Sequence, residues 1–174
     1  AIDNKLAYVT EDRKGNGLIL SKSIKMNTTL ANMSGISNGK VIDTDKEYAV
    51  AEEYRKKLKT KCPTVEQNVG NLSGGNQQKV LLAKWMFAEP DILILDEPTR
   101  GIDVGAKYEI YCIINDLVAA GKSVIMISSE LPEVLGMSDR IYIMNEGRFV
   151  GEVSGEEATS ELIMSRIVKS GKGE

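Results

Sequence analysis

The chain has 174 residues, a length that fits one domain or one domain with an attached lobe. Its 42% hydrophobic and 27% charged fractions are ordinary for a globular protein, and they exclude a wholly disordered chain and a collagen-like repeat. The 22 Lys and Arg against 25 Asp and Glu give a net charge of −3, so we expect no global attraction to nucleic acid. The sequence has no histidine, which excludes His-ligated zinc sites and Ser-His-Asp catalysis.

The apolar runs are short, residues 110–114 being among the longest, whereas a spanning helix needs about 18–20 apolar residues. The chain begins without the basic-then-apolar pattern of a signal peptide. It also begins without Met, just before a predicted strand, so we expect an excised or processed piece of a longer protein.

The first half of the chain predicts one strand followed by a helical lobe. Residues 6–10 predict a short buried strand, and residues 18–44 are polar and rich in loops. Helices are predicted over residues 45–59 and 76–88. Four residues are predicted to share the apolar face of the first helix: Tyr48, Ala51, Tyr54 and Leu58. We therefore expect a helical subdomain over about residues 18–89.

The second half alternates strand and helix. The aliphatic run 92–95 predicts a strand buried on both faces of a parallel sheet, and residues 124–127 predict a second buried strand. A helix over 103–120 connects them. Residues 141–153 predict a hairpin around Asn145-Glu146-Gly147, and residues 159–169 predict a final amphipathic helix.

The alternation predicts an α/β fold with a parallel core sheet into which the helical subdomain is inserted. In this interpretation, residues 1–17 and 90–174 form the α/β core of a single domain that covers residues 1–174.

Two acidic residues, Asp96 and Glu97, directly follow the predicted strand 92–95. Ligands of open α/β sheets lie beyond the carboxyl ends of the strands, so both side chains are expected near a ligand. One carboxylate there can hold hydrated Mg²⁺, and its neighbour can orient or deprotonate a water that attacks phosphate. The same dipeptide is equally compatible with an acidic pair that caps a helix.

Residues 72–78, Leu-Ser-Gly-Gly-Asn-Gln-Gln, lead directly into a predicted helix. A hydroxyl and glycine amides at a helix N-terminus form an anion site, because unpaired N–H groups and the positive end of the helix dipole meet there. The alternative is an ordinary serine N-cap after a glycine turn.

Taken in order, these blocks resemble the ATP-binding-cassette (ABC) ATPases, which are P-loop NTPases. Residues 72–78 resemble the signature loop, residues 92–97 the Walker B strand, and residues 100–103 the D-loop. Three such blocks at this spacing are not expected by chance.

The amino-acid sequences of three segments point to a narrower group within this family. Residues 76–79, 97–107 and 128–133 are similar to the second, C-terminal cassette of tandem-cassette bacterial sugar importers of the ribose, xylose and galactoside type. Residues 8–14 match the Q-loop region of that cassette, so the resemblance covers nearly the whole chain.

The resemblance implies ATP and Mg²⁺ as cofactors. It implies that the signature loop, through Ser73, Gly74, Gly75 and Gln77, contacts an ATP molecule held by the first cassette of the same subunit. Hydroxyl and amide groups there would stabilise negative charge on the γ-phosphate.

Three further roles come from the same resemblance. Asp96 would bind Mg²⁺ through water, and Glu97 would act as the catalytic base or water-orienting group of this cassette's own site. Asp103 in the D-loop would couple the two ATP sites across the interface.

Two positions depart from the family pattern. Glu11 stands where the Q-loop usually has glutamine, and Ser129 stands at the position of the switch histidine. Because serine cannot carry a proton or a positive charge toward the γ-phosphate, we expect this half-site to be slow or non-hydrolytic.

A P-loop requires Gly-x-x-x-x-Gly-Lys-Ser/Thr between a strand and a helix. Gly121-Lys122-Ser123 resembles its end, but Asp116 stands where the first glycine belongs, and the segment runs from a helix into a strand. We interpret it as a helix C-cap and expect the P-loop upstream of Ala1. The chain is therefore expected to be a cassette truncated at its N-terminus and inactive alone, with an uncovered apolar sheet face and strand edge.

The implied partners are the first cassette, the membrane permease of a sugar importer and, indirectly, a sugar-binding protein. The implied location is cytoplasmic, peripheral on the inner face of the cell membrane. Two alternatives stay open at this point. One is a non-catalytic interaction fragment, and the other is a soluble ABC-type ATPase that acts on nucleic acid or ribosomes, which the acidic net charge disfavours.

Overall fold

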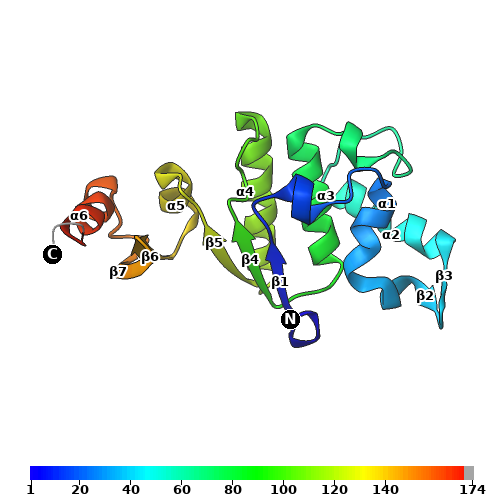
Figure 1. Ribbon diagram of the computed structural model, residues 1–174, viewed down its shortest axis with the longest axis horizontal. Coiled ribbons are helices and arrows are strands. Elements are labelled where there is room, and N and C mark those ends of the chain that lie inside the picture. Colours follow the sequence, from blue (N-terminus) through cyan, green and yellow to red (C-terminus); the bar gives the residue numbers. More distant parts are fainter. Residues whose placement is uncertain (171–174) are drawn as a thin grey trace. The chain divides into compact units, whose positions relative to one another are not determined.

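The computed structural model describes residues 1–170, which form two compact units, Ala1–Ile127 and a second unit that begins at Ser128. The first unit contains a three-stranded sheet with helices, and the second contains a two-stranded hairpin with two helices (Figure 1). No helix in residues 1–170 is both long enough and apolar enough to cross a bilayer. The predicted borders of a helical subdomain and an α/β core stay predictions.

The sheet of the first unit is parallel, with the strand order β1-β4-β5. It is built from β1 (Leu6–Val9), β4 (Ile92–Asp96) and β5 (Ser123–Ile127), so the strands predicted from sequence are confirmed. Because the strands are parallel and in register, the residues that follow β1 and β4 emerge at the same edge of the sheet.

β4 is buried on one face only, and the prediction that it is buried on both faces was wrong. β5, predicted to be a buried strand, alternates between half-buried and exposed residues. Leu93 and Leu95 are buried, whereas Ile92 is 37% exposed. Ile125 and Ile127 on β5 are 53% and 48% exposed. The helices α3 (Gly74–Met86) and α4 (Val104–Ala119) pack on the buried side, with α3 against β1 and α4 against β5. An apolar sheet face is thus exposed, as expected from the sequence.

This one-sided burial gives a first prediction. We expect Leu93→Ala to lower the free energy of unfolding by about 3 kcal/mol, because it leaves a cavity in the core. Ile125→Ala, on the exposed face of the neighbouring strand, is expected to cost about 1 kcal/mol or less. Urea denaturation of the two variants measures the difference, and equal losses would contradict one-sided burial.

The helical lobe lies beyond the β1 edge of the sheet in Figure 1 and contains α1 (Ile24–Thr29), α2 (Thr44–Lys57) and α3, which contact one another. Short 3₁₀ turns and a small hairpin complete the first unit: η1 (Ile2–Asn4), η3 (Leu30–Ile36), η4 (Val69–Asn71), β2 (Ser37–Asn38) and β3 (Val41–Ile42). A single π-helical turn, η2 (Arg13–Gly17), follows β1.

The sequence did not predict α1, because the helix has only six residues and buries polar side chains. Asn27 is 1% exposed, and its amide oxygen accepts from the Ile19 N–H at 2.8 Å while its nitrogen donates to the Ile19 carbonyl at 3.1 Å. A polar residue satisfied in this way gives no apolar periodicity.

The predicted helix over residues 45–59 is confirmed as α2, but the prediction that Tyr48 lies on its buried face was wrong. Tyr48 is 42% exposed, whereas Glu47 is buried. The Glu47 carboxylate accepts from the Thr29 hydroxyl at 3.3 Å and pairs with Lys25 at 3.6 Å. These partners allow a charged side chain to take an inward position.

The second unit consists of α5 (Leu131–Met137), β6 (Arg140–Asn145), β7 (Arg148–Ser154) and α6 (Ser160–Ser170). β6 and β7 pair antiparallel, as predicted, and Glu146 and Gly147 form the two-residue turn with φ values of 47° and 74°. The core of this unit consists of Ile141, Ile143, Val153 and Ile163. The final helix is confirmed, and α5 was not predicted.

Candidate functional site

Asp96 lies at the carboxyl end of β4, where its carboxylate accepts a hydrogen bond from the Tyr8 hydroxyl at 2.6 Å. Tyr8 comes from the neighbouring strand β1, so the parallel pairing brings the two side chains together. The hydrogen bond to Asp96, followed by burial and by the charge of Asp96, raises the pKa of Tyr8 above its ordinary value. Sequence reasoning missed Tyr8, because only the strand pairing shows that it reaches Asp96.

Glu97 turns the chain sharply at the end of the strand. Its φ is 46°, in the left-handed region, its N–H donates to the Ile127 carbonyl at 2.9 Å, and its carbonyl accepts from the Arg100 N–H at 3.1 Å. A non-glycine residue in this conformation costs about 1–3 kcal/mol and is typical of functional sites. The pair does not cap a helix, since the next helix, α4, begins at Val104 and has Asp103 as its N-cap.

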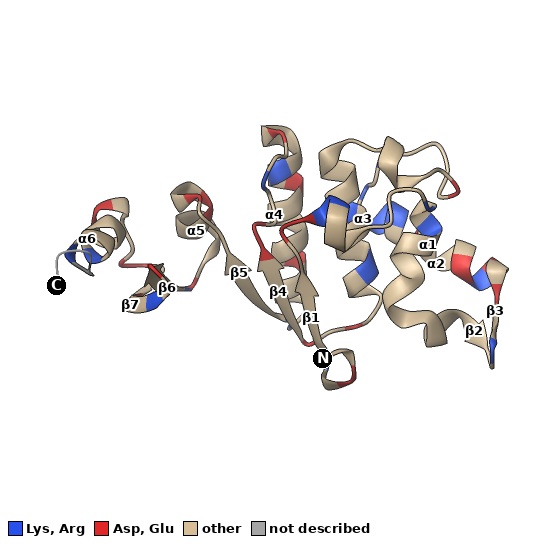
Figure 2. Cartoon of the chain, viewed as in Figure 1, with Lys and Arg blue, Asp and Glu red and all other residues tan. Residues whose placement is uncertain are grey.

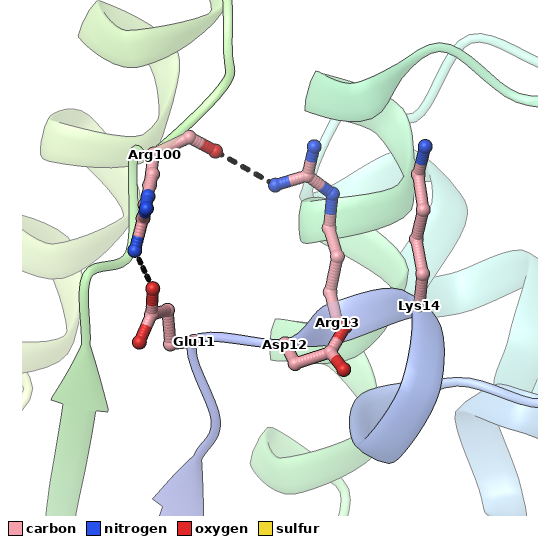
Figure 3. A pocket seen from close by; sticks show the side chains of 5 residues that line it. All are labelled: Glu11, Asp12, Arg13, Lys14 and Arg100. Atoms are coloured by element: carbon pink, nitrogen blue, oxygen red, sulfur yellow. Dashed lines mark hydrogen bonds and ion pairs between the residues drawn. The ribbon is translucent and has the colours of Figure 1, made fainter.

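The segment after β1 meets the segment after Glu97 at a pocket of about 290 Å³. The residues that line this pocket are Glu11, Asp12, Arg13, Lys14 and Arg100 (Figure 3). The Glu11 carboxylate forms an ion pair with Arg100. This ion pair links the predicted Q-loop position to the start of the predicted D-loop. Acidic segments follow both β1 and β4 (Figure 2).

The predicted signature loop leads into α3, with Ser73 as the N-cap residue. The Ser73 hydroxyl does not cap the helix; it accepts from the Asn76 side-chain amide at 3.0 Å. The first amides of α3, at Gly74 and Gly75, have no carbonyl partner within the helix, because no earlier turn exists. This arrangement suits an anion better than it suits an ordinary serine cap.

Gln77 lies behind the loop. It is 4% exposed, and its amide nitrogen donates to the carbonyls of Leu72 at 3.2 Å and Val69 at 3.4 Å. Its buried oxygen has no hydrogen-bond partner within the described residues. The structure therefore makes Gln77 a support for the loop backbone, and a direct contact with ATP stays a prediction.

The signature loop packs closely against the segment that leads into α4. A β-carbon built at Gly75 would lie 2.5 Å from the Ala106 β-carbon, and one built at Gly74 would lie 3.4 Å from the Gly101 carbonyl oxygen. Glycine at position 75 thus permits the beginnings of α3 and α4 to approach each other. The Asp103 carboxylate accepts from the Ala106 N–H at 3.0 Å as the N-cap of α4, and its coupling role stays a prediction.

Two other predicted positions lie apart from this cluster. Ser129 belongs to the second unit, so its role as the switch position stays a prediction. Gly121 has a φ of 84°, and its N–H donates to the Val118 carbonyl at 2.9 Å, while the Lys122 N–H donates to the Leu117 carbonyl at 3.1 Å. This is a Schellman cap that ends α4, as the sequence predicted.

The residues present suit Mg²⁺ bound mainly by phosphate and water. Mg²⁺ is commonly held by one or two carboxylates together with phosphate oxygens and waters. Asp96 offers one such carboxylate, oriented by the Tyr8 hydroxyl. No group of three or more acidic or cysteine side chains within residues 1–170 forms an all-protein cage.

Comparison with known proteins gives the family and the fold of the chain. A family model described as "ABC transporter" matches residues 2–100. The chain belongs to the ABC transporter family. Solved structures show the ABC cassette fold: a nucleotide-free ATP-binding cassette from an ABC transporter matches 99% of this chain and 70% of its own, with a TM-score of 0.76 and 19% identity. A dimeric post-hydrolysis ATP-binding cassette bound to ADP and Pi matches 87% of this chain and 63% of its own, with a TM-score of 0.72 and 22% identity.

Curated members of the ABC transporter family are closely similar in sequence. The L-arabinose transport ATP-binding protein AraG of Geobacillus stearothermophilus is 64% identical over 170 residues, which cover 98% of this chain and 33% of that protein. The xylose import ATP-binding protein XylG of Geobacillus kaustophilus is 57% identical over 95% of this chain and 33% of its own length. The ribose import ATP-binding protein RbsA of Clostridium tetani is 54% identical over 97% of this chain and 34% of its own length. The chain spans about a third of the length of these relatives.

Proposed function

We propose that the chain is part of the ATP-hydrolysing subunit of a sugar importer and occupies the position of the second cassette. The observation that carries the proposal is the assembly of Ser73–Gly75, Glu97 and the Arg100–Asp103 segment within the first unit. The relatives named for L-arabinose, xylose and ribose transport support a sugar as the transported substrate.

The signature loop would act on ATP held by the first cassette. The Ser73 hydroxyl is already oriented by Asn76, and the amides of Gly74 and Gly75 lie at the positive end of a 13-residue helix. These groups donate hydrogen bonds to the γ-phosphate and stabilise the charge that develops during hydrolysis. Gln77 holds the loop backbone in place from inside.

This cassette's own site would be the weaker of the two. ATP with bound Mg²⁺ supplies the phosphoryl group, Asp96 holds the ion through water, and Glu97 orients or deprotonates the attacking water. Glu11 and Ser129 replace the glutamine and histidine of the resembling family, so proton and charge transfer to the phosphate is impaired.

The phosphate-binding P-loop would come from outside these 174 residues. The sequence contains no complete Gly-x-x-x-x-Gly-Lys-Ser/Thr motif, and Gly121-Lys122-Ser123 ends a helix instead of beginning one. The half-exposed sheet face that includes Tyr8, Ile125 and Ile127 is then available to that part of the cassette.

The partners would be the first cassette, a membrane permease and, indirectly, a sugar-binding protein, with the subunit peripheral on the cytoplasmic face of the membrane. The helical lobe formed by α1, α2 and α3 would contact the permease. A nucleic-acid partner is disfavoured by the net charge of −3.

Titration calorimetry of the 174-residue chain with Mg·ATP tests the proposal. We expect no binding in the micromolar range. The 174 residues include the signature loop and the Asp96-Glu97 pair but no P-loop to bind the phosphates of ATP. Micromolar binding would contradict the assignment of the P-loop to another segment. Lys122→Ala then shows whether Gly121-Lys122-Ser123 is the binding site.

A further inference from the structure

We propose that Arg13 is a positioning residue that holds the signature loop and the D-loop segment at a fixed separation. The contacts that carry this inference lie within the first unit. Its consequence for ATP turnover rests on the proposed function.

The Arg13 guanidinium binds the D-loop segment through two successive backbone carbonyls. One terminal nitrogen, Nη1, donates to the Arg100 carbonyl at 2.8 Å (Figure 3). The other, Nη2, lies 3.5 Å from the Gly101 carbonyl. Burial lowers the pKa of Arg13 below its ordinary value. The buried Nε has no hydrogen-bond partner within the described residues, so the carbonyl contacts are the group's polar anchors.

The same Nη2 that lies near the Gly101 carbonyl also lies against the signature loop. A β-carbon built at Gly74 would lie 3.0 Å from Nη2 of Arg13, which means that the guanidinium occupies the space that a side chain at position 74 would need. One planar group is therefore in contact with the signature glycine and with the carbonyls of Arg100 and Gly101.

The backbone that carries Arg13 is itself fixed to the signature helix. The Asp12 carboxylate accepts from the Gly15 N–H at 2.9 Å and closes the turn Arg13–Gly17. At the end of this turn, the buried Lys84 amine from α3 donates to the Gly17 carbonyl at 2.6 Å. Arg13 thus extends from a segment that is anchored to α3. Its hydrogen bond to the Arg100 carbonyl therefore fixes the distance between α3 and the D-loop segment.

The neighbouring charges do not account for this link. The Glu11–Arg100 ion pair is exposed, with Arg100 at 67% and Glu11 at 43% side-chain exposure, and exposed pairs contribute little. Lys14 lines the same pocket and is exposed. Lys14→Met therefore provides a matched control. It removes one positive charge at the residue next to Arg13 and leaves the carbonyl contacts of Arg13 in place.

Hydrogen–deuterium exchange of the 174-residue chain tests the positioning role directly. In Arg13→Met, we expect the amides of Arg100 and Ile102, bonded to the carbonyls of Glu97 and Thr99, to exchange about 10-fold faster, the change expected from losing one charge-assisted hydrogen bond. Amides in the middle of α3 and all amides of Lys14→Met should exchange as in the unmodified chain. Unchanged exchange in Arg13→Met, or an equal effect of Lys14→Met, overturns the inference.

Arg13→Lys covers the case in which the methionine variant does not fold. Lysine keeps the charge but has no planar fork that reaches two carbonyls. The Ile102 amide should still exchange faster, and exchange identical to the unmodified chain contradicts the positioning role.

Turnover separates this inference from the proposed function. In the complete two-cassette subunit, Arg13→Met should lower kcat about 10-fold while the KM for ATP changes by less than about 2-fold, because Arg13 orders the loops and does not contact the nucleotide. Faster exchange without any change in kcat contradicts the proposed role of the loops in hydrolysis and leaves the structural link intact. A change in turnover without faster exchange overturns the positioning role.

Discussion

We expect Ser73→Arg to lower the ATP turnover of the complete two-cassette subunit by about 100-fold or more, the effect of losing a hydrogen-bond donor to a developing negative charge. Ser73 stands at the N-terminus of α3, and its hydroxyl is oriented by the Asn76 amide at 3.0 Å. An arginine at this position removes the donor and places a long side chain at the start of the helix. Steady-state ATPase measurements on the purified subunit provide the comparison.

Glu97→Gln in the same subunit is the matched control. In the proposed function, Ser129 replaces the histidine that would assist Glu97 in hydrolysis, so we expect turnover to change by less than about 3-fold. Two large losses would show that both sites hydrolyse ATP. Unchanged turnover in Ser73→Arg would falsify the assignment of the signature loop.

The second large effect concerns the close contact between α3 and α4. We expect Gly75→Ala to lower the free energy of unfolding by about 2 kcal/mol, because the new methyl group would lie 2.5 Å from the Ala106 β-carbon and force the two helix starts apart. This cost outweighs the gain of about 0.5–1 kcal/mol that alanine usually brings to a helix. Urea denaturation of the 174-residue chain measures it.

A reciprocal change identifies steric overlap as the cause. Ala106→Gly alone should cost about 1 kcal/mol in helix propensity, but it should remove most of the penalty when it is combined with Gly75→Ala. Gly105→Ala, where an added β-carbon lies 3.5 Å from the Asp103 carboxylate, is the control and should be neutral or slightly stabilising. Additive losses in the double variant would rule out direct overlap.

The sequence predicted the elements that have strong local patterns. The aliphatic run of β4, the capped and periodic helices α2 and α4, and the Glu146-Gly147 hairpin all follow from neighbouring residues alone. The α1 and α5 helices were missed because they have six and seven residues, too few to show a period. The prediction that β4 is buried on both faces was wrong. An apolar run places apolar side chains on both faces of a strand, but it does not show whether helices cover one face or both.

For the candidate site, the sequence alone determined which residue types stand next to one another: Asp96 beside Glu97 at a strand end, and Ser73-Gly74-Gly75 at a helix start. The residues alone left both a ligand-binding role and a helix-capping role open, and the family resemblance selected the functional roles, which stay predictions.

The tertiary structure alone decided which separate segments meet. It placed the Tyr8 hydroxyl on Asp96, the Arg13 guanidinium beside Gly74 and the Gly101 carbonyl, and Gln77 behind the signature loop. These contacts join residues up to 88 positions apart, through the parallel pairing of β1 with β4 and the packing of α3 beside α4. Local propensity and periodicity extend over one turn or one strand, whereas such contacts depend on how the strands and helices pack together.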